Sequence, residues 1–210
     1  MIIAIDGPAA SGKGTLGRRL AERYGLNHLD TGLTYRAVGA AMLAAHIPLD
    51  HEAGAARIAH ELDFTDLHPR KLGGPNIAEA ASRVAIYGEV RTALVEAQRR
   101  FARKPPGAVL DGRDIGTVVC PDAEVKIFLT AEPVARARRR ASELELQGRS
   151  PGFEAVLSDI RRRDERDTNR AISPLRQAAD AVLLDTTNLD IEAAFRAAVD
   201  IVERVRALGP

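Results

Sequence analysis

IIAIDGPAASGKGT, residues 2–15, opens the chain and decides its fold. The apolar run Ile2–Asp6 is typical of a buried parallel strand, and the residues after it match the pattern GxxxxGK at the start of a helix. Glycines let backbone N–H groups converge on phosphate oxygens, and a lysine here reaches the terminal phosphates. The alternative, a glycine-rich turn that binds nothing, does not explain this position between strand and helix. The stretch predicts an ATP-binding phosphate loop made of Gly7, Pro8, Ala9, Ala10, Ser11, Gly12, Lys13, Gly14 and Thr15.

Short apolar runs alternate with helical patterns along the rest of the chain. Strands are expected at 28–30, 108–111, 125–130 and 181–185, and helices at 13–24, 35–45, about 133–146 and about 190–208. Strands joined through helices need crossover connections, which produce a parallel sheet covered on both faces. The predicted fold class is therefore α/β, with three layers and a central parallel sheet.

Two segments interrupt this alternation. Residues 46–77 contain proline, glycine and histidine with little periodicity, which predicts a short insertion. Residues 148–170 are rich in arginine and acidic side chains and begin with a glycine-containing, hinge-like stretch, so we expect a mobile lid there. The remainder, about 1–45, 78–147 and 171–210, would form the core of a single domain.

Composition limits the possible partners. Thirty Lys+Arg balance 29 Asp+Glu, and the net charge of +1 argues against a nucleic-acid-coating surface. One cysteine, Cys120, cannot form an intrachain disulfide and fits a reducing compartment. No apolar run is long enough to span a bilayer, and no basic leader is present. We expect a cytoplasmic monomer that binds neither nucleic acid nor membranes.

Five further segments point to one family. The ending GKGT of the phosphate loop is the variant seen in nucleoside monophosphate kinases. LDTGLTYR at 29–36, AASRVA at 80–85 with Val90-Arg91, LDGRDIGTVV at 110–119, DAEVKIFL at 122–129 and RDERDTNR at 163–170 resemble successive motifs of bacterial-type cytidylate kinases, with Thr31 in place of a serine. The resemblance runs from Met1 to about Asp185. It implies a P-loop kinase fold in which 46–77 is a shortened nucleoside-monophosphate-binding insertion, without that family's usual Ile-Arg-Thr-like motif.

The resemblance also implies the acceptor site. Arg36 and Arg113 would hold the phosphate of CMP or dCMP, Ser82, Arg91 and Asp114 would read cytosine, and Arg163 and Asp167 would hold the sugar hydroxyls. The implied CMP-binding set is Thr31, Tyr35, Arg36, Ser82, Arg91, Arg113, Asp114, Arg163, Asp167 and Arg170.

The spacing of Arg163, Asp167 and Arg170 predicts that one helix carries all three on one face. In an isolated helix this would be a solvated ion-pair stripe, but beside a phosphate loop it can supply cations to the reaction. The expected catalytic residues are Lys13, Arg113, Arg163 and Arg170. Mg²⁺, bound as Mg·ATP, would be positioned by Thr15 and Asp111 through water. The alternatives are a P-loop kinase for AMP, UMP or shikimate, or a non-catalytic ATP-binding regulatory module.

Overall fold

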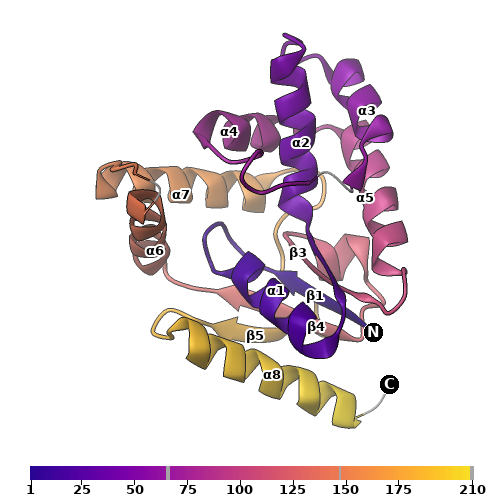
Figure 1. Cartoon of the computed structure of the whole chain (residues 1–210), viewed down its shortest axis with the longest axis vertical. Coiled ribbons are helices and arrows are strands. Elements are labelled where there is room, and N and C mark those ends of the chain that lie inside the picture. Colours follow the sequence, from indigo (N-terminus) through magenta and orange to yellow (C-terminus); the bar gives the residue numbers. More distant parts are fainter. Residues whose placement is uncertain (65–66, 147, 209–210) are drawn as a thin grey trace. The chain divides into compact units, whose positions relative to one another are not determined.

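The computed structural model describes residues 1–64, 67–146 and 148–208. The chain forms two compact units, of which the larger joins Met1–Leu29 to Pro105–Pro210 and the smaller is Asp30–Lys104 (Figure 1). In the described part of the chain, every helix is too short or too polar to cross a bilayer.

The larger unit is built on a five-stranded parallel sheet. Its strands, in the spatial order β2-β3-β1-β4-β5, are β2 (Asn27–Asp30), β3 (Ala108–Gly112), β1 (Ile2–Asp6), β4 (Val125–Thr130) and β5 (Val182–Asp185). The central strand β1 pairs in parallel with β3 and with β4, so that Ile3 lies opposite both Val109 and Val125. All five carboxyl ends therefore meet at one edge, which is where ligands bind in sheets of this kind.

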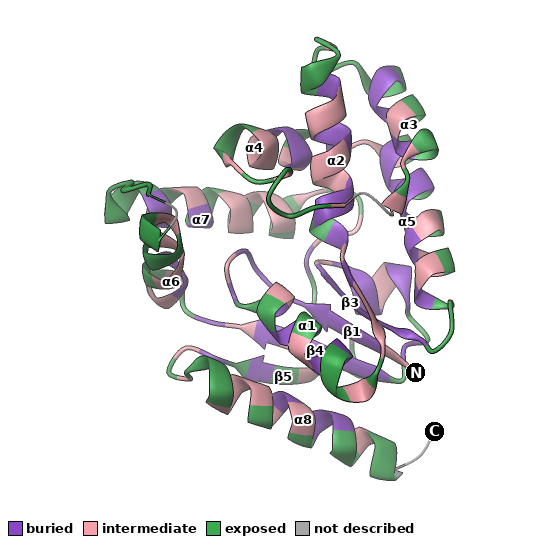
Figure 2. Ribbon diagram, in the orientation of Figure 1, coloured by how far each residue is buried: buried purple, intermediate pink, exposed green. Residues whose placement is uncertain are grey.

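Helices flank this sheet. Within the larger unit these are α1 (Lys13–Tyr24), the short π-helical turn η2 (Ile115–Val119) and α8 (Ile191–Leu208), which contact the strands, together with α6 (Pro133–Leu146) and α7 (Phe153–Asn169). Leu20 of α1 and Val202 of α8 pack with Ile5 and Ile127 in one core on the same face of the sheet. Leu110, which points to the other face, is also fully buried, and Figure 2 shows β3 buried along its whole length and β1 buried along most of it. The fold is the predicted three-layer α/β fold.

The helices α6 and α7 pair with each other through a small apolar cluster. Ala137 of α6 meets Leu157 and Ile160 of α7, and Ala10 of the phosphate loop packs against the same cluster. The phosphate loop is thus in apolar contact with the helix pair that follows β4.

The smaller unit is helical, with α2 (Thr31–Ala44), α3 (Glu52–Glu61), α4 (Pro75–Val84) and α5 (Gly88–Ala102). Val38, Met42, Val84 and Leu94 are among the residues that form its own core.

Most predicted elements are confirmed, whereas α4 and α5 were not predicted from the sequence. Two further differences have local causes. The helix expected from residue 35 begins at Thr31, because the Asp30 carboxylate accepts the N–H of Gly32 at 2.9 Å and caps the helix. The predicted insertion at 46–77 contains α3, whose buried side is made of small residues such as Ala55 and Ala59. Alanines give a weak hydrophobic pattern, so this helix was not predicted.

Gly7 admits no side chain. Its φ is 155°, and a Cβ there would lie 2.1 Å from the backbone carbonyl oxygen of Leu129 on β4. We predict that Gly7→Ala lowers the free energy of unfolding by roughly 2–4 kcal/mol, from backbone strain and overpacking. Urea unfolding followed by circular dichroism measures the change.

Gly152→Ala is the matched control, because its φ is −56° and an added Cβ meets no atom within 4 Å. This variant should stay within about 0.5 kcal/mol of the wild type. Equal effects at both positions would contradict the steric argument.

Candidate active site

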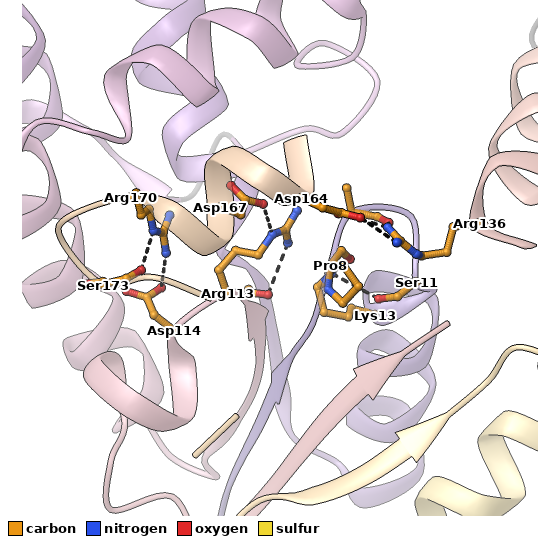
Figure 3. Close-up of polar contacts among 12 residues, drawn as sticks. Pro8, Ser11, Lys13, Arg113, Asp114, Arg136, Asp164, Asp167, Arg170 and Ser173 are labelled. Carbon is orange, nitrogen blue, oxygen red and sulfur yellow. Dashed lines mark hydrogen bonds and ion pairs between the residues drawn. The ribbon is translucent and has the colours of Figure 1, made fainter. Parts of the chain in front are cut away.

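The phosphate loop runs from the end of β1 into the first turn of α1. Gly12, which precedes α1, has φ 96°, and no side chain caps the helix. Lys13 is buried and donates from Nζ to the Pro8 carbonyl at 2.7 Å and to Ser11 Oγ at 3.4 Å (Figure 3). Thr15 is exposed on the first turn of α1. A helix start with uncapped N–H groups and a lysine beside it is suited to bind phosphate.

Asp6, the last residue of β1, ties this loop to the segment after β3. Its two carboxylate oxygens accept the N–H groups of Ile115 at 2.7 Å and Gly116 at 2.8 Å. Burial raises the pKa of Asp6 to about 6, against the lowering effect of these hydrogen bonds and of Lys13. The loop and the turn that carries Arg113 and Asp114 are therefore held by one buried carboxyl group.

The predicted arginines and aspartates of the larger unit form two pairs. Arg113 Nε donates to Asp167 Oδ2 at 2.6 Å, and Arg170 Nη2 lies 3.8 Å from Asp114 Oδ1 (Figure 3). Burial opposes ionisation of Asp167, but the charge and hydrogen bond of Arg113, aided by Arg170 and Arg163, lower its pKa below the usual range. The larger unit thus brings together Arg113, Asp114, Arg163, Asp167 and Arg170, all predicted from the sequence.

The prediction that one helix carries Arg163, Asp167 and Arg170 is wrong for Arg170. The helix α7 ends at Asn169, and Arg170 follows it in an extended conformation. Beyond this point the chain turns back, because the N–H of Leu175 donates to the Asp167 carbonyl and Arg170 Nε donates to the Ser173 carbonyl. Arg170 therefore reaches Asp114 from a loop.

Asp111, predicted to help position Mg²⁺, is buried at the end of β3. Its Oδ2 lies 2.9 Å from Nε2 of His28 on β2. Gly17 of α1 leaves room for this pair, since a Cβ there would lie 2.8 Å from His28 Nε2 and 3.3 Å from Asp111 Oδ2. Three elements thus meet at the Asp111 carboxylate.

The other predicted CMP-binding residues belong to the smaller unit. Thr31, Tyr35 and Arg36 lie on α2, Ser82 on α4 and Arg91 on α5. The guanidinium of Arg91 is buried, 5.6 Å from the centre of the Tyr35 ring. Arg36 Nη1 donates to the Leu72 carbonyl at 3.1 Å. Arg91 and Tyr35 are therefore brought together within this unit.

Sequence reasoning missed three polar residues next to the predicted set. They are Asp6 at the end of the first strand, Arg136 on α6 and Asp164 on α7, which is adjacent to Arg163. Asp6 directly precedes Gly7 of the phosphate loop, which was a usable signal. Arg136 and Asp164 stand among several similar charged residues, so nothing in the local pattern distinguishes them.

The comparisons with known proteins agree with this architecture. A gluconokinase from Sinorhizobium meliloti 1021 has a TM-score of 0.50 at 16% identity, covering 98% of this chain and 94% of that one. An uncharacterized protein from Eubacterium ventriosum ATCC 27560 has a TM-score of 0.58 at 13% identity, covering 97% and 98%. At these identities the likeness shows the fold alone. Together with the phosphate loop, this fold defines the class of P-loop proteins with a three-layer α/β architecture.

Sequence relatives give the family. The model of the cytidylate kinase family matches residues 3–204. A cytidylate kinase from Azorhizobium caulinodans is 62% identical over 206 residues, which are 98% of this chain and all of the relative. Another, from Rhizobium meliloti, is 57% identical over 202 residues, which are 96% and 95% of the two chains. The chain belongs to the cytidylate kinase family, and the resemblance found in its motifs is confirmed.

The raised pKa of Asp6 has a measurable consequence. The pKa of Asp6 is 3.8 in the unfolded chain and about 6 in the native state, so the native state binds the proton of this carboxyl group more tightly. The protonated group therefore contributes fully to stability below about pH 4. It is lost as the pH rises to about 6 and above, by on the order of 3 kcal/mol. We predict that the NMR signal of the Asp6 carboxyl carbon, assigned by its absence from Asp6→Asn, titrates with a midpoint near pH 6.

Asp167 is the internal control, since its pKa is lowered and it should titrate below 3.8. An Asp6 midpoint at or below 4 would mean that the two amide hydrogen bonds outweigh burial.

Proposed function

We propose that this chain transfers the γ-phosphoryl group of ATP to CMP and dCMP, giving CDP and dCDP. The observation that carries the proposal is that relatives at 57–62% identity over nearly the whole chain are named cytidylate kinases. The phosphate loop and the arginine–aspartate pairs of the larger unit supply the chemistry that this reaction needs.

The phosphate loop supports ATP as donor. Residues Gly7–Thr15 provide backbone N–H groups at the start of α1, and Lys13 lies within the loop. Two of the acceptors that Lys13 now contacts are neutral, a carbonyl and a hydroxyl oxygen. An anionic phosphate oxygen is a stronger acceptor for an ammonium group, so Lys13 can exchange these contacts for the nucleotide.

The acceptor is supported by the chemistry of the two arginine–aspartate pairs. A carboxylate on Arg113 occupies the position that a phosphate group can take, since both are anionic acceptors for a guanidinium. The Asp167 carboxylate, in turn, can accept hydrogen bonds from sugar hydroxyls in place of the one from the Arg113 guanidinium. A nucleotide that carries both a phosphate and a ribose can therefore replace one internal ion pair with two contacts of its own.

The remaining acceptor roles belong to the same proposal. Arg36 would bind the acceptor phosphate with Arg113, while Ser82, Arg91 and Asp114 would contact the cytosine. Thr31 and Tyr35 would line the same site. The insertion at 46–77 and, within the lid at 148–170, the part that precedes α7 would close around the two nucleotides, since α7 itself is docked through Asp164 and Asp167. Closure excludes water, which otherwise accepts the phosphoryl group.

Mg²⁺ fits the donor set at the carboxyl ends of the strands. The described residues hold no cluster of three or more His, Cys, Asp or Glu side chains that would form a protein cage for a metal. Mg²⁺ bound with a nucleotide usually keeps several waters and takes one or two protein oxygens besides phosphates. Thr15 and Asp111 would hold it through water, and the ion would neutralise charge on the ATP phosphates.

The reaction needs positioning and positive charge more than proton transfer. An oxygen of the CMP phosphate attacks the γ-phosphorus in line, so that its bond forms as the bond to ADP breaks. The attacking phosphate is already ionised, and no general base is required. Lys13, Arg113, Arg163 and Arg170 would stabilise the charge on the transferring group. Every proposed residue comes from one chain, so a monomer is sufficient for the reaction. A cytoplasmic location belongs to the same proposal.

A coupled assay of ADP release tests the function. We predict turnover with Mg·ATP plus CMP or dCMP, weak turnover with UMP or AMP, and none without an acceptor. Lys13→Ala should lower kcat by several orders of magnitude with the fold retained, since it removes a cation that acts on the transferring group. ATP binding without turnover in the presence of any acceptor would instead indicate a regulatory module. A higher turnover with another acceptor would contradict the proposal that CMP is the substrate.

Base selection tests the proposed role of Asp114. Cytosine presents an amino donor where uracil presents a carbonyl acceptor, and a carboxylate pairs only with the donor. An unpaired buried polar group costs roughly 1–3 kcal/mol. We predict that Asp114→Asn lowers the ratio of kcat/KM for CMP over UMP by at least about tenfold, mainly through CMP.

Asp122→Asn, a surface change on the same connection, is the control and should leave the ratio as in the wild type. An unchanged ratio in Asp114→Asn would assign the selectivity to Ser82 and Arg91.

A further inference from the structure

A buried arginine outside the predicted site joins three parts of the larger unit. Arg136 is 3% exposed, and its guanidinium donates hydrogen bonds to three groups, of which Figure 3 shows Asp164. Nε donates to the carbonyl of Ala131, just after β4, at 2.7 Å. Nη1 donates to the carbonyl of Ala9, inside the phosphate loop, at 3.0 Å. The two Nη atoms also donate to Asp164 of α7 at 3.1 and 2.6 Å, as a bidentate pair.

The contact with Ala9 orients a peptide unit of the phosphate loop. The carbonyl of Ala9 and the N–H of Ala10 belong to one planar peptide, in which they point in opposite directions. Ala10 has φ 57°, in the left-handed region that residues with a Cβ rarely adopt. Such a conformation persists only where its surroundings hold it. Arg136 supplies a polar contact for this purpose, and the α6–α7 cluster against Ala10 supplies an apolar one.

The contact with Asp164 holds α7 next to Arg163, another of the proposed cations. Asp164 follows Arg163 directly, and Asp167 lies one turn further on the same helix. Asp164 is bound to Arg136 on α6, and Asp167 to Arg113 after β3. The helix is therefore docked at two points, of which only the second uses a residue proposed to contact the nucleotide.

We infer that Arg136 and Asp164 are positioning residues that lock the phosphate loop to helix α7. The inference rests on the proposed function, because the pair fixes the separation between Lys13 and Arg163 while touching neither nucleotide. Both cations must face one transferring phosphoryl group, and small displacements of such groups lower the rate strongly. The lock makes the arrangement part of the fold before any substrate binds.

Three variants test the lock. Asp164→Asn keeps the size of the side chain but presents an amide N–H₂ group to a guanidinium. Arg136→Lys keeps the charge but cannot reach Ala9, Ala131 and Asp164 together. Asp164→Glu keeps the pair's charges and displaces α7 by one methylene. We expect each to lower kcat by at least about tenfold with KM values changed less than about threefold.

Hydrogen exchange of the ligand-free protein is the second readout. In the same variants the amides of residues 9–15 should exchange at least about tenfold faster than in the wild type. The matched controls are Arg140→Lys and Glu143→Gln, which alter an ion pair of 2.7 Å one turn further along α6, half-buried at Arg140 and exposed at Glu143. Both controls should keep wild-type kcat and wild-type exchange in the loop.

The outcomes separate a positioning role from a structural one. Variants that lose thermal stability alone, with kcat per folded molecule and loop exchange at wild-type values, would overturn the inference. If Arg136→Lys fails to fold, Asp164→Glu tests the inference in its place. Wild-type kcat and wild-type loop exchange in Asp164→Glu would overturn the inference as well. A wild-type protein without CMP-dependent turnover would count against the proposed function, and the ligand-free exchange would still decide the lock.

Discussion

The buried carboxyl group of Asp6 is the contact on which the rest of the site depends. It ends the central strand, directly precedes the phosphate loop, and accepts two N–H groups from residues 109 and 110 positions further along the chain. A carboxyl group without these donors would be costly to bury at this place. Because both oxygens are engaged, the start of the phosphate loop and the turn with Arg113 and Asp114 cannot move independently. The central sheet thereby sets the geometry of both proposed substrate-binding parts of the larger unit.

Much of the fold could be predicted because its signals are local. The strands at 2–6 and 125–130 are β-branched apolar runs, and the helix at 13–24 ends at Gly25, which adopts the left-handed conformation of a helix cap. The start of α2 was placed late because the capping interaction of Asp30 lies outside the hydrophobic pattern. The helix α3 was missed since its core-facing residues are alanines, which bury little apolar surface each.

The same distinction between local and long-range signals applies to the residues of the site. Lys13 and the arginine–aspartate motif could be found because they stand at fixed spacings within short segments. The network of Arg136 could not, because its partners Asp164 and Ala9 are 28 and 127 positions away, and many arginines surround it in the sequence. The position of Arg170 was wrong for a related reason. Helical periodicity alone does not reveal that the N–H of Leu175 donates a hydrogen bond to the Asp167 carbonyl, so that the chain turns back after α7.

Gly17 of α1 packs against the hydrogen-bonded pair of His28 on β2 and Asp111 on β3, which brings position 17 and position 28 into contact. A glycine inside a helix is ordinarily a weak point, by roughly 0.5–1 kcal/mol relative to alanine. Here the imidazole of His28 fills the space that a side chain at 17 would need. The two positions therefore behave as one steric unit, and the tolerance of either to change depends on the residue at the other. A side chain at 17 would have to displace the His28 imidazole from the Asp111 carboxylate, so bulk on α1 would be accommodated at the expense of a contact between β2 and β3.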